Sequence, residues 1–128
     1  MIENLRRDPI VSFLLRNSSL TETQLDTIIA STIEGNLAQK AQSREKGKVS
    51  KGAFVRTLRQ GQGNVEASLY TLMLLVYLGL VKQERFDQFL RTQRLFAQVR
   101  ELQLDSESVS RLIDGMSAFA QEFSGRKR

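Results

Sequence analysis

Residues 65–78, with the sequence VEASLYTLMLLVYL, form a segment that is apolar almost throughout. A helix built from it carries apolar side chains on nearly every side, which is typical of a helix buried in a core. Tyr70 and Tyr77 are expected to pack in that core. Gly79 follows directly, and glycine commonly ends helices. We therefore expect residues 65–78 to form the buried, central helix of an all-α bundle.

Helix-start signals precede this segment at three places. Asp8-Pro9 suits an N-cap followed by proline at the first helical position, and predicts a short helix to about residue 16. Thr21 and Gln24 form a capping-box pattern, which predicts a helix to about residues 41–44 with Gly35 as a weak point. Ser50 predicts a third helix, to about residue 60.

Two glycines separate that third helix from the central one. We expect residues 61–63, Gly-Gln-Gly, to form a break or tight turn, and Asn64 to cap the helix that follows.

Two more helices are expected after Gly79, over about residues 83–102 and from a cap at Asp105 to about residue 123. No segment shows the alternation of apolar and polar residues that indicates a strand. The sequence thus predicts a compact bundle of five to six helices, organised as one domain over residues 1–123. Residues 124–128 are expected to form a flexible basic tail.

The composition excludes several kinds of chemistry. The chain has no cysteine and no histidine, so it lacks thiolate ligands, cysteine nucleophiles and the commonest general base. We expect no enzymatic activity, no metal and no cofactor. The N-terminus lacks the pattern of a signal peptide, and no apolar run approaches the roughly 20 residues of a membrane helix. A cytoplasmic protein without membrane association is expected.

Positive charge is concentrated in residues 40–59. This stretch has a net charge of +6, whereas the whole chain has +5, so the other residues together carry −1. Such a local patch is typical of a surface that binds phosphate groups.

The helix expected after Ser50 orients part of this charge. At about 100° per residue, Phe54 and Leu58 lie on one side, and Arg56 and Arg59 lie on the other. Arginine and glutamine can bind guanine and adenine edges with two hydrogen bonds, whereas lysines position a protein on phosphates. The predicted nucleic-acid-binding residues are Lys40, Arg44, Lys46, Lys48, Ser50, Lys51, Arg56, Arg59 and Gln60.

Residues 36–60, NLAQKAQSREKGKVSKGAFVRTLRQ, resemble a generic helix-turn-helix element: a helix with small residues, a turn, and a second helix that opens on serine. The resemblance implies that the second helix enters the major groove of DNA, with Phe54 and Leu58 holding it to the core. The segment expected to be the turn is longer and more charged than the usual one. The function that follows is that of a DNA-binding transcription regulator or accessory factor.

Two alternatives stay open. The same patch could bind RNA or a ribosome. The chain could instead be a helical adaptor or assembly subunit that works through an apolar stripe on its last helix. The same stripe could form a homodimer, which would also suit a DNA-binding chain. The members of this stripe are Leu112, Met116, Phe119 and Phe123.

Overall fold

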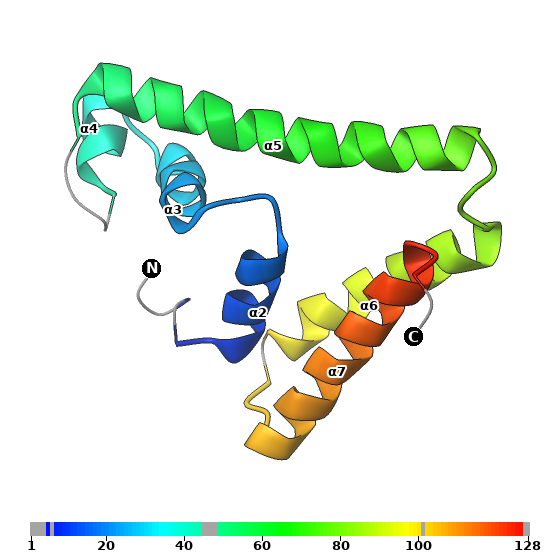
Figure 1. Ribbon diagram of the computed structural model, residues 1–128. Helices are drawn as coiled ribbons and strands as arrows, with labels where there is room; N and C mark the ends of the chain where they lie inside the picture. Colours follow the sequence, from blue (N-terminus) through cyan, green and yellow to red (C-terminus); the bar gives the residue numbers. More distant parts are fainter. Residues whose placement is uncertain (1–4, 6, 45–48, 101, 127–128) are drawn as a thin grey trace. The chain divides into compact units, whose positions relative to one another are not determined.

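The computed structural model describes residues 5, 7–44, 49–100 and 102–126, and this part of the chain contains helices and no strand. The all-α prediction is confirmed. Figure 1 shows the elements in chain order, which are α2 (Pro9–Asn17), α3 (Glu22–Ser31), α4 (Leu37–Gln42), α5 (Lys51–Tyr77), α6 (Gln83–Val99) and α7 (Ser106–Phe123). None of these helices combines the length and the apolar character that a membrane span requires.

The predicted helix starts at Asp8 and Thr21 are confirmed. A carboxylate oxygen of Asp8 accepts hydrogen bonds from the backbone N–H groups of Ile10, at 2.9 Å, and Val11, at 3.4 Å. Thr21 and Gln24 form both hydrogen bonds of the capping box, each 3.1 Å long. These side chains satisfy N–H groups that have no partner within the first turn of a helix.

The helix that begins after Thr21 is shorter than predicted. It ends at Ser31, and a second helix, α4, begins after a new cap at Asn36. Gly35 between them has a φ of +133°, which no residue of a right-handed helix adopts. Asn36 and Gln39 form a second capping box, with two hydrogen bonds of 2.9 Å. Gly35 is therefore a break, because a competing helix start follows it immediately.

The break predicted at residues 61–63 is wrong, because α5 continues through both glycines to Tyr77. Gly61 is buried, and a Cβ atom there would lie 3.1 Å from Cδ1 of Ile28 and 3.3 Å from Cβ of Gln24. The absence of a side chain at Gly61 thus allows α5 to pack closely against α3. Asn64 does not cap a helix; its side-chain amide donates a 3.0 Å hydrogen bond to Oε1 of Gln24.

The predicted burial of residues 65–78 is also wrong. Val65 is 43% exposed, Tyr70 69% and Tyr77 88%, and neither tyrosine lies in a core. Gly79 does end the helix as predicted, with a φ of +72°. The N–H groups of Gly79 and Leu80 donate to carbonyls of the last turn, which is the Schellman arrangement.

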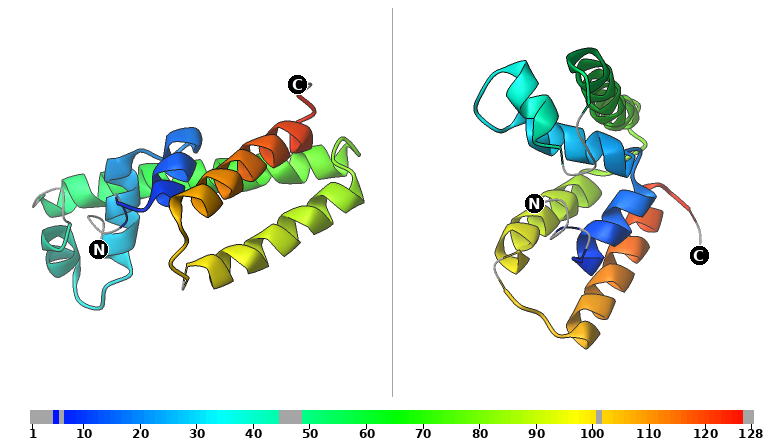
Figure 2. Two further views of the ribbon diagram at one scale, coloured as in Figure 1. Left: turned by 90° about the horizontal axis from the view of Figure 1, so that it is seen from below. Right: turned by 90° about the vertical axis from the view of Figure 1, so that its left-hand side faces the viewer.

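By its internal contacts the chain divides into two compact units, Met1–Thr71 and Leu72–Arg128, and α5 contributes to both. The core of the first unit lies where α3, α4 and the start of α5 meet (Figure 2). It consists of Ala30, Ala41 and Phe54, with Val49 and Leu58 packed against it. A cluster of two alanines and one phenylalanine lets three helices approach closely around a single large side chain.

In the second unit, α6 and α7 run antiparallel (Figures 1 and 2). The ring of Phe89 on α6 lies 6.2 Å from that of Phe123 on α7, and Phe119 lies 5.8 Å from Phe123. Arg85 and Glu122 form an ion pair of 2.9 Å between the same helices. Asp105 caps α7 as predicted, since it accepts a 2.7 Å hydrogen bond from the N–H of Ser108.

The apolar stripe of α7 therefore has neighbours within its own unit. Its members, Leu112, Met116, Phe119 and Phe123, are half-buried. At the end of the helix, the N–H of Arg126 donates a 2.9 Å hydrogen bond to the carbonyl of Gln121. The tail is thus bonded to α7 as far as Arg126, and residues 127–128 lie outside the described residues.

Candidate nucleic-acid interface

The first turns of α5 are fixed by a cap and a buried anchor. The hydroxyl of Ser50 accepts a 3.2 Å hydrogen bond from the N–H of Ala53, as expected of an N-cap. Phe54 is fully buried between α3 and α4, and Leu58 packs against the same cluster. Because these two side chains lie one turn apart, they determine which side of α5 faces away from the core.

The opposite side of α5 is open to solvent. Arg56, Arg59 and Gln60 are all exposed, as the helical spacing predicted. Gly52 and Gly63 lie on the same side, and a Cβ atom at either would meet nothing within 4 Å. Long donor side chains are thus flanked by bare backbone, which leaves room for a phosphate row or a groove to approach. Lys51 is exposed in the first turn, although helical spacing places it nearer to the side of Leu58. We call Arg56, Arg59 and Gln60, together with Lys51, the α5 basic face.

The charge of this face is not neutralised within the described part of the chain. Lys51, Arg56 and Arg59 form no ion pair there, and no acidic residue occurs between residues 49 and 65. The first turn of α5 contains no acidic residue either. Since the N-terminal end of a helix carries partial positive charge, the helix dipole adds to the charge of the side chains. This end of α5 therefore attracts anions.

Arg44 is directed into the first unit instead of toward solvent. Its side chain is 8% exposed, and its Nε lies 3.8 Å from Oδ2 of Asp26, a carboxylate that is itself 3% exposed. Nε has no hydrogen-bond partner in the described residues. Arg44 thus compensates the charge of a buried aspartate on α3, and we leave it out of the α5 basic face.

The remaining predicted residues fall into three groups. Lys40 is half-buried on α4, and the hydroxyl of Ser50 is used as a cap. Lys46 and Lys48 lie outside the described residues. The structure therefore brings Lys51, Arg56, Arg59 and Gln60 together on one exposed helix.

Two successive helices, α4 and the first part of α5, lie within residues 36–60, as the helix-turn-helix resemblance implies. Their dimensions differ from those of such an element. Two helices, α4 and α5, are joined by residues 43–50, which is a longer connection than the usual turn of three or four residues. The second helix has 27 residues and is much longer than a typical recognition helix. The charge and exposure of the α5 basic face do not depend on either dimension.

Sequence reasoning missed the contact between α3 and α5. Gln24 both closes its capping box and accepts the hydrogen bond from Asn64, and Gly61 lets the two helices approach. No local signal identifies this contact, because its residues are some 40 positions apart. The start of α4 did have a signal, the pattern Asn36-x-x-Gln39, which matches the capping box.

No group of three or more acidic side chains in the described residues could hold a metal ion. Comparisons with protein-family profiles, with curated proteins and with solved structures find no match for this chain.

Proposed function

We propose that this chain binds nucleic acid through the α5 basic face, as a DNA-binding regulator or accessory factor. Arg56, Arg59 and Lys51 contact phosphates, and Gln60 reaches base edges. The role is one of binding and not of catalysis. The proposed setting is the cytoplasm, because a cysteine-free chain carries no sign of adaptation to an oxidising compartment.

One observation carries the proposal: two arginines stand exposed beside glycines on one side of α5, a lysine is exposed in its first turn, and none of the three forms an ion pair with a described residue. A solvated surface helix usually intersperses such residues with acids, as α6 does with Glu84 and Asp87 among its arginines. The α5 basic face has no such acid.

Duplex DNA is favoured over RNA because the face is presented by a helix. The major groove of B-form DNA admits a helix, whereas the major groove of an RNA duplex is too narrow for its bases to be read. RNA is the alternative, and tighter binding to a structured RNA than to a DNA duplex would select it.

The test is a binding titration against a DNA duplex and a structured RNA at about 50 mM and about 200 mM salt. We expect wild type to bind the duplex more tightly, and to lose affinity steeply with salt as condensed counterions are released. Arg56→Ala/Arg59→Ala should lower the slope of log K against log salt by about 2 and weaken low-salt binding by on the order of tenfold per arginine.

Arg91→Ala/Arg94→Ala is the matched control. These two arginines are exposed, have the same spacing of three and lie on α6, so the variant removes the same net charge elsewhere. It should retain most of the affinity. If both double variants bind like wild type, or if both lose affinity equally, the α5 basic face is not the binding surface.

A further inference from the structure

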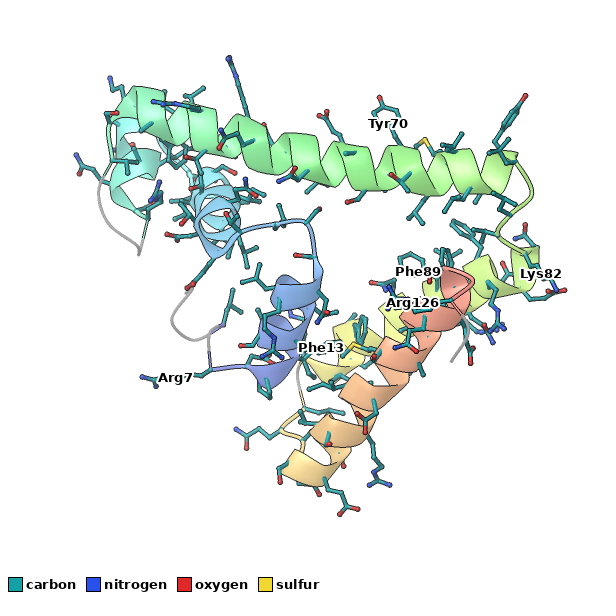
Figure 3. All side chains as sticks on the ribbon, in the orientation of Figure 1. Arg7, Phe13, Tyr70, Lys82, Phe89 and Arg126 are labelled. Carbon is teal, nitrogen blue, oxygen red and sulfur yellow. The ribbon has the colours of Figure 1, made fainter. Side chains whose placement is uncertain are left out.

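The C-terminal half of α5 carries large apolar side chains in water. Leu69 is 52% exposed, Met73 59% and Leu74 56%, and Val65, Tyr70 and Tyr77 on the same half of the helix are exposed as well. Figure 3 shows Tyr70 projecting from α5 on the side away from α3. A monomer seldom leaves so many large apolar side chains together on one element.

These side chains share one side of the helix. At about 100° per residue, seven of them fall within about half of its circumference. Leu72 and Leu75 lie outside this arc and are half-buried, and Ser68, next to them, contacts Ser19 at 3.3 Å. We call the exposed arc the α5 apolar face; its members are Val65, Leu69, Tyr70, Met73, Leu74, Val76 and Tyr77.

The face is almost free of charge. Residues 67–81 contain no Asp, Glu, Lys or Arg, and Glu66 is the only charged residue between Asn64 and Lys82. A partner of opposite charge would find nothing to pair with here. The matching surface must be apolar as well.

We propose that the α5 apolar face binds the same face of a second copy of this chain, with the two helices antiparallel about a two-fold axis near Met73. Seven side chains with roughly 100 Å² of exposed area each give an upper limit on the order of 700 Å² per copy, which approaches the about 800 Å² per partner of a standard interface. A two-fold axis requires only one self-complementary surface, and this face carries no charged residue from Ala67 to Val81.

The positive charges on the N-terminal half of α5 determine whether the two helices of the pair run parallel or antiparallel. In a parallel pair, Lys51, Arg56 and Arg59 of one copy would lie beside the same residues of the other, and like charges would repel. In an antiparallel pair centred on Met73, the two basic faces lie at opposite ends. Arg56 is 17 residues from Met73, so the two Arg56 residues would be about 50 Å apart along the helix axis. Within the pair, Leu69 meets the partner's Tyr77, and Met73 meets the partner's Met73.

Molar mass in solution tests the proposal, and it does so independently of nucleic-acid binding. We expect sedimentation equilibrium of the wild type to give twice the 14.6 kDa of one chain. Met73→Lys places two like charges beside the axis and should give a monomer. Leu95→Lys is the matched control, because Leu95 is 57% exposed on α6, close to the 59% of Met73; this variant should remain dimeric. A monomeric wild type, or a dimer that persists in Met73→Lys, would overturn the proposal.

Disulfide trapping gives a second readout that does not depend on a destabilising charge. The chain has no cysteine, so Met73→Cys introduces a single thiol, and two copies would bring these thiols together at the axis. Mild oxidation should give a covalent dimer from Met73→Cys, and little from Leu95→Cys at the same concentration. Equal trapping of both variants would contradict the proposed axis. So would a monomeric wild type that floats with neutral phosphatidylcholine vesicles, since lipid would then be the occupant.

Discussion

Replacing the two glycines of α5 one at a time tests how closely this helix packs on α3. Gly61 and Gly63 are in the same helix, two residues apart, and alanine in place of glycine favours a helix interior by about 1 kcal/mol. A methyl group at position 63 would meet nothing within 4 Å. We therefore expect Gly63→Ala to raise the free energy of unfolding by about 0.5–1 kcal/mol.

Gly61→Ala gains the same helix propensity and adds a clash. The new methyl group would lie 3.1 Å from Cδ1 of Ile28 and 3.3 Å from Cβ of Gln24. The end of Ile28 can rotate away, but Cβ of Gln24 moves only with the backbone of α3. Overfilling a packed contact costs about 1–3 kcal/mol, so the gain is offset or reversed. The two variants should differ by about 1–3 kcal/mol, with Gly61→Ala the less stable.

Urea unfolding followed by circular dichroism measures this difference, and thermal unfolding checks it at about 2–6 °C per kcal/mol for a chain of this size. Equal stabilisation of both variants would refute the reasoning, because it would mean that α3 does not approach α5 at Gly61.

Three further predictions follow from other contacts in the structure. Thr21→Ala removes one side of the capping box and should lower the free energy of unfolding by about 1 kcal/mol in urea; an unchanged midpoint would contradict the cap. Arg44→Met removes the cation that lies 3.8 Å from the buried carboxylate of Asp26 and should cost about 2 kcal/mol, whereas Arg56→Met on the exposed face should change stability by less than about 0.5 kcal/mol; equal effects would show that Arg44 is not a structural residue. The pKa of Asp105 is lowered, first by the hydrogen bond from the backbone N–H of Ser108 and then by that from its side chain, so its carboxylate contributes stability above the unfolded pKa, which is lost as the pH falls through the lowered pKa. The stability difference between wild type and Asp105→Asn should accordingly be constant above about pH 4 and change below it, and a difference that stays constant to pH 2 would contradict this role.

The starts of the helices could be predicted from the sequence because caps are local. Thr21, Ser50 and Asp105 each bond to an N–H group three residues ahead, so a short window contains both partners. The exposed side of α5 at Arg56 and Arg59 was predictable for a similar reason, since helical geometry alone places these residues opposite Phe54.

Gly79 ends α5 as predicted, but the roles of Gly35 and Gly61 could not be predicted in this way. A glycine can break a helix, end it or allow another helix to approach, and the choice depends on residues elsewhere. Gly35 is a break because Asn36 starts a helix at once, whereas Gly61 is an approach point because Ile28 on α3 lies against it. Asn36 is adjacent to Gly35 and belongs to a local capping-box pattern. Ile28 is distant in sequence from Gly61, and no local pattern links the two.

The apolar segment 65–78 shows a second limit. Its composition indicates a surface that favours apolar neighbours, but does not say what covers that surface. In the described structure Tyr77 and Leu69 remain exposed, so the prediction of burial within the chain failed. Arg44 shows the converse case, since a cation in a basic stretch is directed to Asp26, 18 residues earlier.

The most direct test of the central claim is to map where a DNA duplex contacts the chain. Amide chemical shifts of ¹⁵N-labelled protein should change most in the first turns of α5, from Lys51 to Gln60, and little in α6 and α7 when the duplex is added at low salt. Raising the salt should reverse the changes. Shifts confined to α6 and α7, or no shifts up to a large excess of duplex, would contradict the assignment of the α5 basic face as a nucleic-acid-binding surface.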